Sequence, residues 1–484
     1  MIKDLNIKYF YIIALTFILI NSISIGLEFY YVPIISFILL FSYIAFFHLN
    51  TLLYLIVFLV PMSINLNSND IKLGLSLPTE PLIIIVLFIF IYQFIAKKDF
   101  LQYDFLKHPF SIVIYLSLLW MFFTSITSQI PLVSFKYLTS RIWFIVAFYF
   151  VASVVFFQNK ANIKTFIWSY VFGFIPIITY TIIHHSLYNF RQIEGHWVMH
   201  PFFNDHTSYA AMIAMFTPFI FGSIFDKELS PLKRRFVFVL FIYFLFAVAL
   251  SYTRAAWLSL VVAFGVFLLV YYKVKMRVIF VLFLTVLGIF ISTKDQVMMY
   301  VEKNNNRSSS NYLEHIKSAY NVTTDVSNTE RINRWQCAFR MFHEKPFLGY
   351  GPGTYQFEYA PFQKKYEKTI ISTNAGTKGN AHSEYIGPLA ESGVLGSLLV
   401  IILLFLVIYK GIKVYHATEN KTSKIVVISA LLGLITYFTH GTLNNFLDTD
   451  KASAPFWGFI AIIAVIDIEN KLKISKQNSP LDNE

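Results

Sequence analysis

Long apolar runs separated by short polar connections make up most of the chain. Each run approaches the roughly 17–25 residues that an α-helix needs to cross the hydrocarbon core of a bilayer. We expect spans near residues 9–26, 31–47, 50–66, 80–96, 109–127, 136–157, 163–183, 207–225, 235–251, 254–272, 277–293, 385–409, 424–441 and 455–469. The pattern predicts an all-α polytopic membrane protein with about 12–14 transmembrane helices.

Composition supports lipid as the solvent of most of the chain. Of the 484 residues, 56% are hydrophobic and 14% are charged, whereas about 25% of a soluble protein is charged. These values exclude a cytosolic enzyme, a disulfide-rich secreted scaffold and a disordered protein. Cys337, the single cysteine, cannot form an internal disulfide.

The basic residues predict how the chain is oriented. Lysines and arginines concentrate in cytoplasmic loops of membrane proteins, which also accounts for the net charge of +12. With the N-terminus inside, the short outside connections hold Lys72, Arg191 and Lys451, and both termini are cytoplasmic. We expect membrane helices over 1–293, a large periplasmic loop over 294–382, further helices over 383–470 and a cytoplasmic tail over 471–484.

Arg254 lies between two expected spans with almost no loop between them. An arginine at that depth costs several kcal/mol unless it finds a partner or a water-filled cavity. It is either a fixed cation aimed at an anionic substrate or a side chain that snorkels to the interface.

His382 lies where the long loop re-enters the membrane and a helix begins. The positive end of a helix dipole favours neutral imidazole, which can accept a proton from a hydroxyl. His382 is therefore a candidate general base, and a simple polar cap is the alternative.

The long loop contains a predicted helix from Glu330 to His343, with Arg331 and Arg334 three residues apart. The planar guanidinium of an arginine can donate two hydrogen bonds to phosphate oxygens, so these arginines could bind a phosphate group. A solvated helix face with a Glu330–Arg334 ion pair is the alternative that fits the same spacing. The glycines that follow, over 349–353, form either an anion-binding loop or a structural turn.

Five histidines occur between His184 and His206, and Arg191 lies among them. His196 and His200 have the i, i+4 spacing of helix-borne metal ligands, but the stretch is short and has Trp197 where a zinc-protease motif has glutamate. A substrate-facing outer loop and plain interfacial histidines are the alternatives. Asp448 and Asp450 could bind a sugar or pair with Lys451.

Together these segments resemble the bacterial O-antigen ligase and polymerase family. The matching motifs are Ser251-Tyr252-Thr253-Arg254-Ala255-Ala256-Trp257, Arg331-x-x-Arg334-Trp335 with the later glycines, and His382-Ser383-Glu384-Tyr385 with Glu391-x-Gly393-x-x-Gly396. Phe203-Asn204-Asp205-His206 is also similar to a family segment, with His206 where asparagine is common.

The resemblance implies a metal-independent, inverting glycosyltransferase of the C-type architecture in the bacterial inner membrane, with its active site on the periplasmic side and no cofactor. The donor would be a glycan on undecaprenyl diphosphate. His382 and Arg254 would be catalytic, and Arg331, Arg334, Arg191 and His206 would bind the diphosphate or substrate.

The acceptor decides between several functions. A lipid A–core saccharide would make the protein an O-antigen ligase, which we favour, and another lipid-linked repeat unit would make it a polymerase of O-antigen or exopolysaccharide. Transfer of the glycan to protein hydroxyls is a further possibility, and it would need the same binding site for the donor. A transporter of lipid-linked sugars is the alternative from a different class, but such proteins tend to show internal repeats and broken midplane helices.

Overall fold

A computed structural model gives the arrangement of the chain. It describes residues 7–66, 75–275, 329–368, 372 and 379–478, together with scattered positions between 277 and 292. The expected span near 277–293 lies largely outside these residues, as does the polar run from Asn304 to Ser310.

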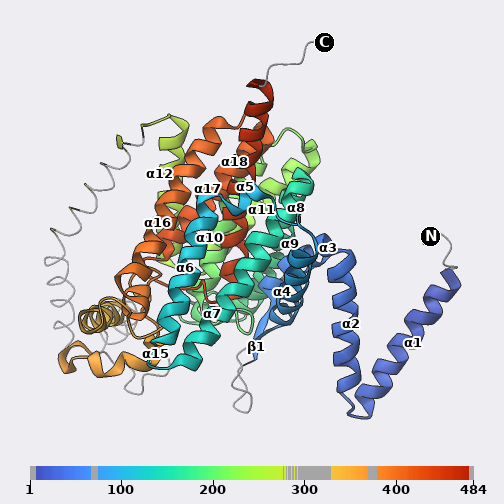
Figure 1. Cartoon of the computed structure of the whole chain (residues 1–484), viewed down its shortest axis with the longest axis horizontal. Coiled ribbons are helices and arrows are strands. Elements are labelled where there is room, and N and C mark those ends of the chain that lie inside the picture. The colour runs from blue at the N-terminus through green and yellow to red at the C-terminus, as the bar shows by residue number, and fades with distance from the viewer. Residues whose placement is uncertain are drawn as a thin grey trace.

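Helices dominate the described residues (Figure 1). In the first half of the chain they are α1 (Ile7–Gly26), α2 (Tyr31–Phe47), α3 (Leu49–Leu59), η1 (Val60–Met62), α4 (Thr79–Ala96), α5 (Tyr103–Leu106), α6 (Pro109–Ile126), α7 (Pro131–Ile145), η2 (Val146–Val151), α8 (Ala152–Gln158), α9 (Lys160–Ser186), η3 (Glu194–His196), α10 (His206–Ser223) and α11 (Pro231–Leu250). They continue with α12 (Arg254–Tyr271), α15 (Tyr355–Glu358), η4 (Ala360–Phe362), η5 (Lys365–Glu367), α16 (Gly387–Ala417), α17 (Lys421–His440) and α18 (Asp450–Asn478). Residues 329–344 are also helical.

The helices begin where local sequence signals favour a start. Asp205 accepts the Ser208 N–H at 2.8 Å and caps α10, and Asn420 accepts the Ser423 N–H at 2.8 Å and caps α17. Proline occupies the first position of α6, α7 and α11, where its missing N–H costs no helical hydrogen bond.

Eight helical segments in the described part of the chain are long and apolar enough to cross a membrane. They include α4, α6, α9, α12, α16, α17 and α18, and α7 continues through η2 and α8 to give one more. The protein is an all-α polytopic membrane protein, as the apolar runs predict. The expected spans agree with the observed helices to within a few residues, except that α16 and α18 extend about eight residues further at their C-terminal ends.

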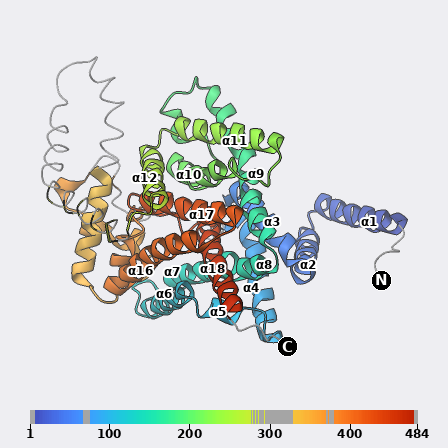
Figure 2. The same ribbon diagram turned by 90° about the horizontal axis from the view of Figure 1, so that it is seen from above.

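The core lies where α10, α17 and α18 pack together (Figure 2), and the apolar part of α18 is almost wholly buried. A short antiparallel hairpin, β1 (Ile64–Leu66) with β2 (Leu75–Leu77), precedes α4. Helices α1 and α2 stand beside the bundle and leave most of their side chains exposed, as lipid-facing helices do.

Helix α16 contains a sharp kink at Gly393, whose φ of +67° and ψ of −168° are not helical. A Cβ at this position would lie 2.0 Å from the Phe347 carbonyl oxygen. Only glycine therefore allows the loop segment at Pro346–Phe347 to pack against the kink, where the Val394 N–H donates to the Pro346 carbonyl at 2.9 Å. This contact ties the hydrophilic loop to the start of a membrane helix.

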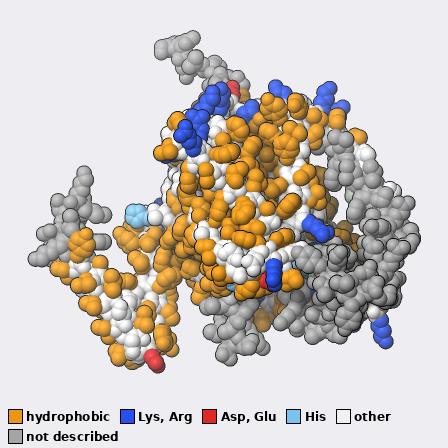
Figure 3. Space-filling model, turned by 180° about the vertical axis from the view of Figure 1, so that it is seen from behind, with side chains coloured by type: hydrophobic (Ala, Val, Ile, Leu, Met, Phe, Trp, Pro, Cys, Tyr) orange, Lys and Arg blue, Asp and Glu red, His pale blue; other side chains and the backbone are white. Residues whose placement is uncertain are grey.

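The surface is apolar around the bundle and charged at one end. Figure 3 shows a broad hydrophobic belt, with lysine and arginine side chains gathered at the end where α18 finishes. Ion pairs at this end include Lys160–Glu469 at 3.1 Å and Lys471–Asp467 at 2.8 Å. The candidate residues of the next section lie at the other end.

Candidate functional site

Three helices that begin at the same end of the bundle bring most of the candidate residues together. Helices α10, α12 and α16 begin there, and α17 ends there, so His206, Arg254 and His440 lie at helix termini and His382 lies five residues before α16. The helix at 329–344 carries Arg331 and Arg334 to the same end.

His382 has a left-handed backbone, with φ of +49°. Its N–H donates to the Asn380 side-chain oxygen at 3.0 Å. The next residue, Ser383, accepts hydrogen bonds from the Tyr385 and Ile386 N–H groups at 3.3 Å. A strained non-glycine conformation persists only where its surroundings over-determine it, and such residues concentrate at functional sites.

Glu384 and Tyr385 supply that support. One oxygen of the Glu384 carboxylate accepts from the Tyr437 hydroxyl at 2.6 Å and from the Phe446 and Leu447 N–H groups at 2.8 and 3.0 Å. The Tyr385 hydroxyl donates to the Phe438 carbonyl at 2.8 Å. The residues after His382 are thus fastened to α17 and to the loop before α18, which fixes where the imidazole lies.

The surroundings of His382 hold its imidazole neutral. Burial, followed by the positive charges of Arg331 and Arg334, lowers the pKa of His382 to about 4, and Asp205 and Glu330 act in the opposite direction. At neutral pH the ring therefore has one nitrogen able to accept a proton or a hydrogen bond.

Arg331 is half-buried and lies within electrostatic reach of His382 and Asp205. Burial lowers the pKa of Arg331, while the Asp205 carboxylate raises it; an arginine nevertheless stays charged at neutral pH. A fixed positive charge next to a neutral imidazole is a suitable arrangement for binding an anion.

Arg334 is held by protein groups on two sides. Its Nε donates to Glu330 at 2.8 Å, and its guanidinium lies over the Tyr359 ring at 4.5 Å. Both charged side chains are 5% exposed, and a Cβ at Gly379 would overlap the guanidinium. The Glu330–Arg334 pair considered from the sequence therefore exists, but it is buried rather than solvated.

The loop before α10 completes the cluster. The His196 and His206 rings stack with their centroids 4.2 Å apart, and both Asp205 and Arg331 are within electrostatic reach of His206. The Thr253 hydroxyl donates to the His206 carbonyl at 3.2 Å. Arg254, the next residue, opens α12 with an exposed side chain.

Arg191 lies in the same loop with its side chain exposed. Its carbonyl accepts a hydrogen bond from His185 Nε2 at 2.8 Å, so its backbone helps to shape the loop. Among the described residues, no hydrogen bond or ion pair connects its guanidinium to His382, Arg331 or Asp205.

His440 is a member of the cluster that the sequence analysis missed. It ends α17 at 1% exposure, within electrostatic reach of Asp205, His206 and Arg331. One ring nitrogen pairs with the Asn444 side chain at 3.3 Å, and Nε2 has no hydrogen-bond partner among the described residues. Its sequence signal is a lone histidine at the end of an apolar run, which does not separate it from an interfacial residue.

Arg141 is a second missed residue, buried within α7. It donates to the Leu447 carbonyl at 2.8 Å and to the Tyr137 hydroxyl. Burial and the nearby Glu384 raise the pKa of Asp448 to about 6, and Arg141 opposes that shift. Arg141 therefore fixes the loop between α17 and α18, on which Glu384 also depends.

The glycine-rich stretch is a structural turn. The Tyr350 and Gly351 N–H groups donate to the Ala390 and Glu391 carbonyls at 3.0 and 2.8 Å, and the Tyr355 N–H donates to the Glu391 carboxylate at 3.1 Å. Of the two readings considered from the sequence, the turn is the one the structure adopts, because these donors already bind α16.

The structure also shows the surroundings of Asp450, His196 and His200. Asp450 lies 3.8 Å from the Lys451 ammonium and accepts a hydrogen bond from the Thr79 hydroxyl, so it pairs within the protein. His196 ends η3 and stacks on His206, while the His200 side chain is exposed. No group of three histidine, cysteine or acidic residues in the described ranges is arranged to hold a metal ion.

Part of the chain that carries this cluster is similar to a known family. Residues 238–401 match the model of the O-antigen ligase family. The match includes Arg254, Arg331, Arg334 and His382, whereas Asp205, His206, Arg141 and His440 lie outside it. No curated protein was found to match the chain.

Similarity to the O-antigen ligase family over residues 238–401 supports a glycan-transferring role, as either a ligase or a polymerase. The apolar helices and the family together indicate a multi-pass membrane protein.

Proposed function

We propose that the protein transfers a glycan from undecaprenyl diphosphate to a hydroxyl of the lipid A–core saccharide, as an O-antigen ligase. The reaction takes place at the end of the bundle that carries His382, which we assign to the periplasmic face of the bacterial inner membrane, with both termini in the cytoplasm. The observation that carries the proposal is the His382 imidazole, held on a left-handed backbone within electrostatic reach of the Arg331 cation, in the segment that matches the O-antigen ligase family.

The arginines account for binding and departure of the diphosphate. Negative charge develops on the leaving diphosphate as its bond to the anomeric carbon breaks, and fixed cations stabilise that charge. Arg331 and Arg254 supply these cations. Arg191 and His206 line the approach of the donor to them. Arg334 is already paired with Glu330, so we assign it to positioning the helix that carries Arg331.

His382 acts on the acceptor. A sugar hydroxyl is a weak nucleophile at neutral pH, and a hydrogen bond to the neutral ring orients it toward the anomeric carbon. The acceptor oxygen forms the new bond, the diphosphate oxygen leaves with the electron pair, and His382 takes the proton. Bound diphosphate raises the pKa of His382, because its charge opposes that of the arginines, and so makes the ring a stronger base when the donor is present.

This single displacement inverts the anomeric configuration, and the arginines supply the positive charge that other transferases take from a metal ion. We therefore expect purified protein to remain active in a chelator. A strict requirement for a divalent metal would contradict this part of the proposal.

A polymerase of O-antigen or exopolysaccharide repeat units is the second candidate, because the family match supports either role. The two functions share the donor site and differ in the acceptor. The surface glycan of a strain lacking the protein separates them. Loss of all long glycan from lipid A–core, with lipid-linked polymer accumulating, supports the ligase, whereas single repeat units remaining on the core support the polymerase.

A further inference from the structure

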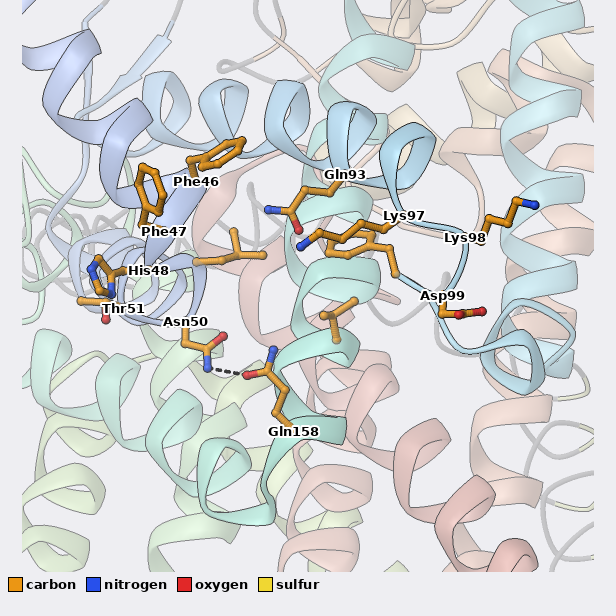
Figure 4. A pocket seen from close by; sticks show the side chains of 13 residues that line it. Phe46, Phe47, His48, Asn50, Thr51, Gln93, Lys97, Lys98, Asp99 and Gln158 are labelled. Atoms are coloured by element: carbon orange, nitrogen blue, oxygen red, sulfur yellow. Dashed lines mark hydrogen bonds between the residues drawn. The ribbon is translucent and has the colours of Figure 1, made fainter. Parts of the chain in front are cut away.

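A polar cavity lies at the end of the bundle opposite the His382 cluster. The Thr79–Asp450 hydrogen bond joins the start of α4 to the start of α18 at the cluster's end, and the cavity lies where α4 finishes, between α2, α3 and α8 (Figure 4). Its volume is about 750 Å³, which lies within the roughly 300–1,000 Å³ of small-molecule sites.

Side-chain amides form the inner wall of this cavity. The Asn50 amide donates to the Gln158 oxygen at 2.6 Å. Gln93 is 7% exposed, and its side chain makes no hydrogen bond within the described part of the chain. Figure 4 shows the Gln93 amide directed into the cavity. A buried amide that binds no protein group costs free energy unless water or a ligand satisfies it.

The charge of the cavity is positive. Lys97 and Lys98 line it together with one acid, Asp99, which leaves a formal charge of 2 − 1 = +1. Lys97 extends back toward Gln93, whereas Lys98 and Asp99 lie at the far side (Figure 4). The Lys97 ammonium and the NH2 group of the Gln93 amide both supply N–H donors, which favours a singly charged anion.

The walls next to the cavity are apolar and open to lipid. Phe46 and Phe47 at the end of α2 are 43% and 62% exposed, and Ile95 near the end of α4 is 78% exposed. A ligand that fills the cavity therefore has a polar head at the level where the apolar helices end and has apolar chains along α2 and α4.

We propose that this cavity binds the phosphodiester head group of an anionic phospholipid. The phosphate oxygens accept hydrogen bonds from the Gln93 amide and the Lys97 ammonium, and the acyl chains lie on the exposed faces of α2 and α4. Free phosphate shares the head-group chemistry but not the chains. The site is independent of the glycan-transfer chemistry at the other end of the bundle.

Native mass spectrometry of the full-length purified protein tests the site. Wild-type protein titrated with phosphatidylglycerol should retain one lipid, and Gln93→Leu and Lys97→Ala should each weaken retention about tenfold, the effect of losing one charge-assisted hydrogen bond. Lys413→Ala is the matched control, because Lys413 is exposed at the same end but lies outside the cavity. Lys97 is itself exposed, so its replacement should leave the thermal unfolding midpoint unchanged and separates binding from folding.

Two further titrations identify the ligand. Inorganic phosphate at millimolar concentration should not displace the lipid, and displacement would reassign the site to free phosphate. Phosphatidylethanolamine, with no net charge, should bind at least tenfold more weakly. Equal retention by wild type, Gln93→Leu and Lys97→Ala, or no lipid retained by wild type, would overturn the proposal.

Discussion

The Tyr437 hydroxyl donates a 2.6 Å hydrogen bond to the Glu384 carboxylate, two residues after His382. This bond joins the segment before α16 to α17 across 53 positions of sequence. The same oxygen of Glu384 also accepts two backbone N–H groups, so one carboxylate sets the position of the segment that carries the imidazole.

Replacing Glu384 should therefore affect both stability and activity. We expect Glu384→Ala to lower the free energy of unfolding by roughly 2 kcal/mol or more, because it leaves buried donors unpaired. Tyr437→Phe removes one of the three hydrogen bonds and should cost about 1 kcal/mol. Thermal unfolding in detergent measures both effects, and an unchanged midpoint in Glu384→Ala would show that the bonds do not hold the segment.

The buried Glu330–Arg334 pair should behave as a unit. Arg334→Met removes the cation that pairs with the buried Glu330 carboxylate, and we expect a loss of roughly 3–5 kcal/mol. The double variant Glu330→Gln/Arg334→Met removes both charges and should recover part of that loss. Chemical unfolding of wild type, Glu330→Gln, Arg334→Met and the double variant in a double-mutant cycle measures the coupling, and purely additive effects would contradict it.

Arg331 should differ from Arg334 in kinetics. Because it is assigned to the donor diphosphate, Arg331→Ala should raise the KM for the lipid-linked donor or lower kcat/KM by about 10–100-fold, the effect of losing a charged hydrogen bond or two. The thermal unfolding midpoint should change little. Steady-state kinetics with varied donor provides the measurement, with exposed His343→Ala on the same helix as the control. Unchanged donor kinetics would remove Arg331 from the site.

The lowered pKa of His382 predicts a pH dependence of stability. The imidazole titrates near its ordinary 6.5 in the unfolded chain and at about 4 in the folded protein. Between these values the unfolded chain binds more protons, so stability rises with pH and is lost as pH falls from 6.5 toward 4. Unfolding midpoints across this range should be flatter for His382→Gln than for wild type. Identical curves would contradict the assigned environment.

The sequence predicts the helices well and the site in part. Spans follow from hydrophobicity, which is local, and Gly393 is visible as a glycine within an apolar run although its kink depends on the Phe347 carbonyl. Arg254 and His382 can be recognised because they belong to short motifs.

Other members of the site depend on packing between distant segments. His440 and Arg141 lie inside apolar runs, and nothing in the neighbouring residues indicates that one approaches Asp205 and the other the Leu447 carbonyl. The spacing of Glu330, Arg331 and Arg334 fits either two phosphate-binding arginines or an ion pair between Glu330 and Arg334. Only burial of that helix face decides between these two possibilities.

The most direct test of the account is a kinetic cycle on Arg254 and His382 in purified protein. Release of undecaprenyl diphosphate from a defined donor is followed by mass spectrometry for wild type, Arg254→Ala, His382→Ala and the double variant. We predict that each single variant loses at least about 100-fold in kcat, and that the double variant is far less impaired than the product of the two losses, because the residues act in one site. Full activity in either folded single variant, or losses that multiply, would contradict a shared site for the diphosphate and the acceptor.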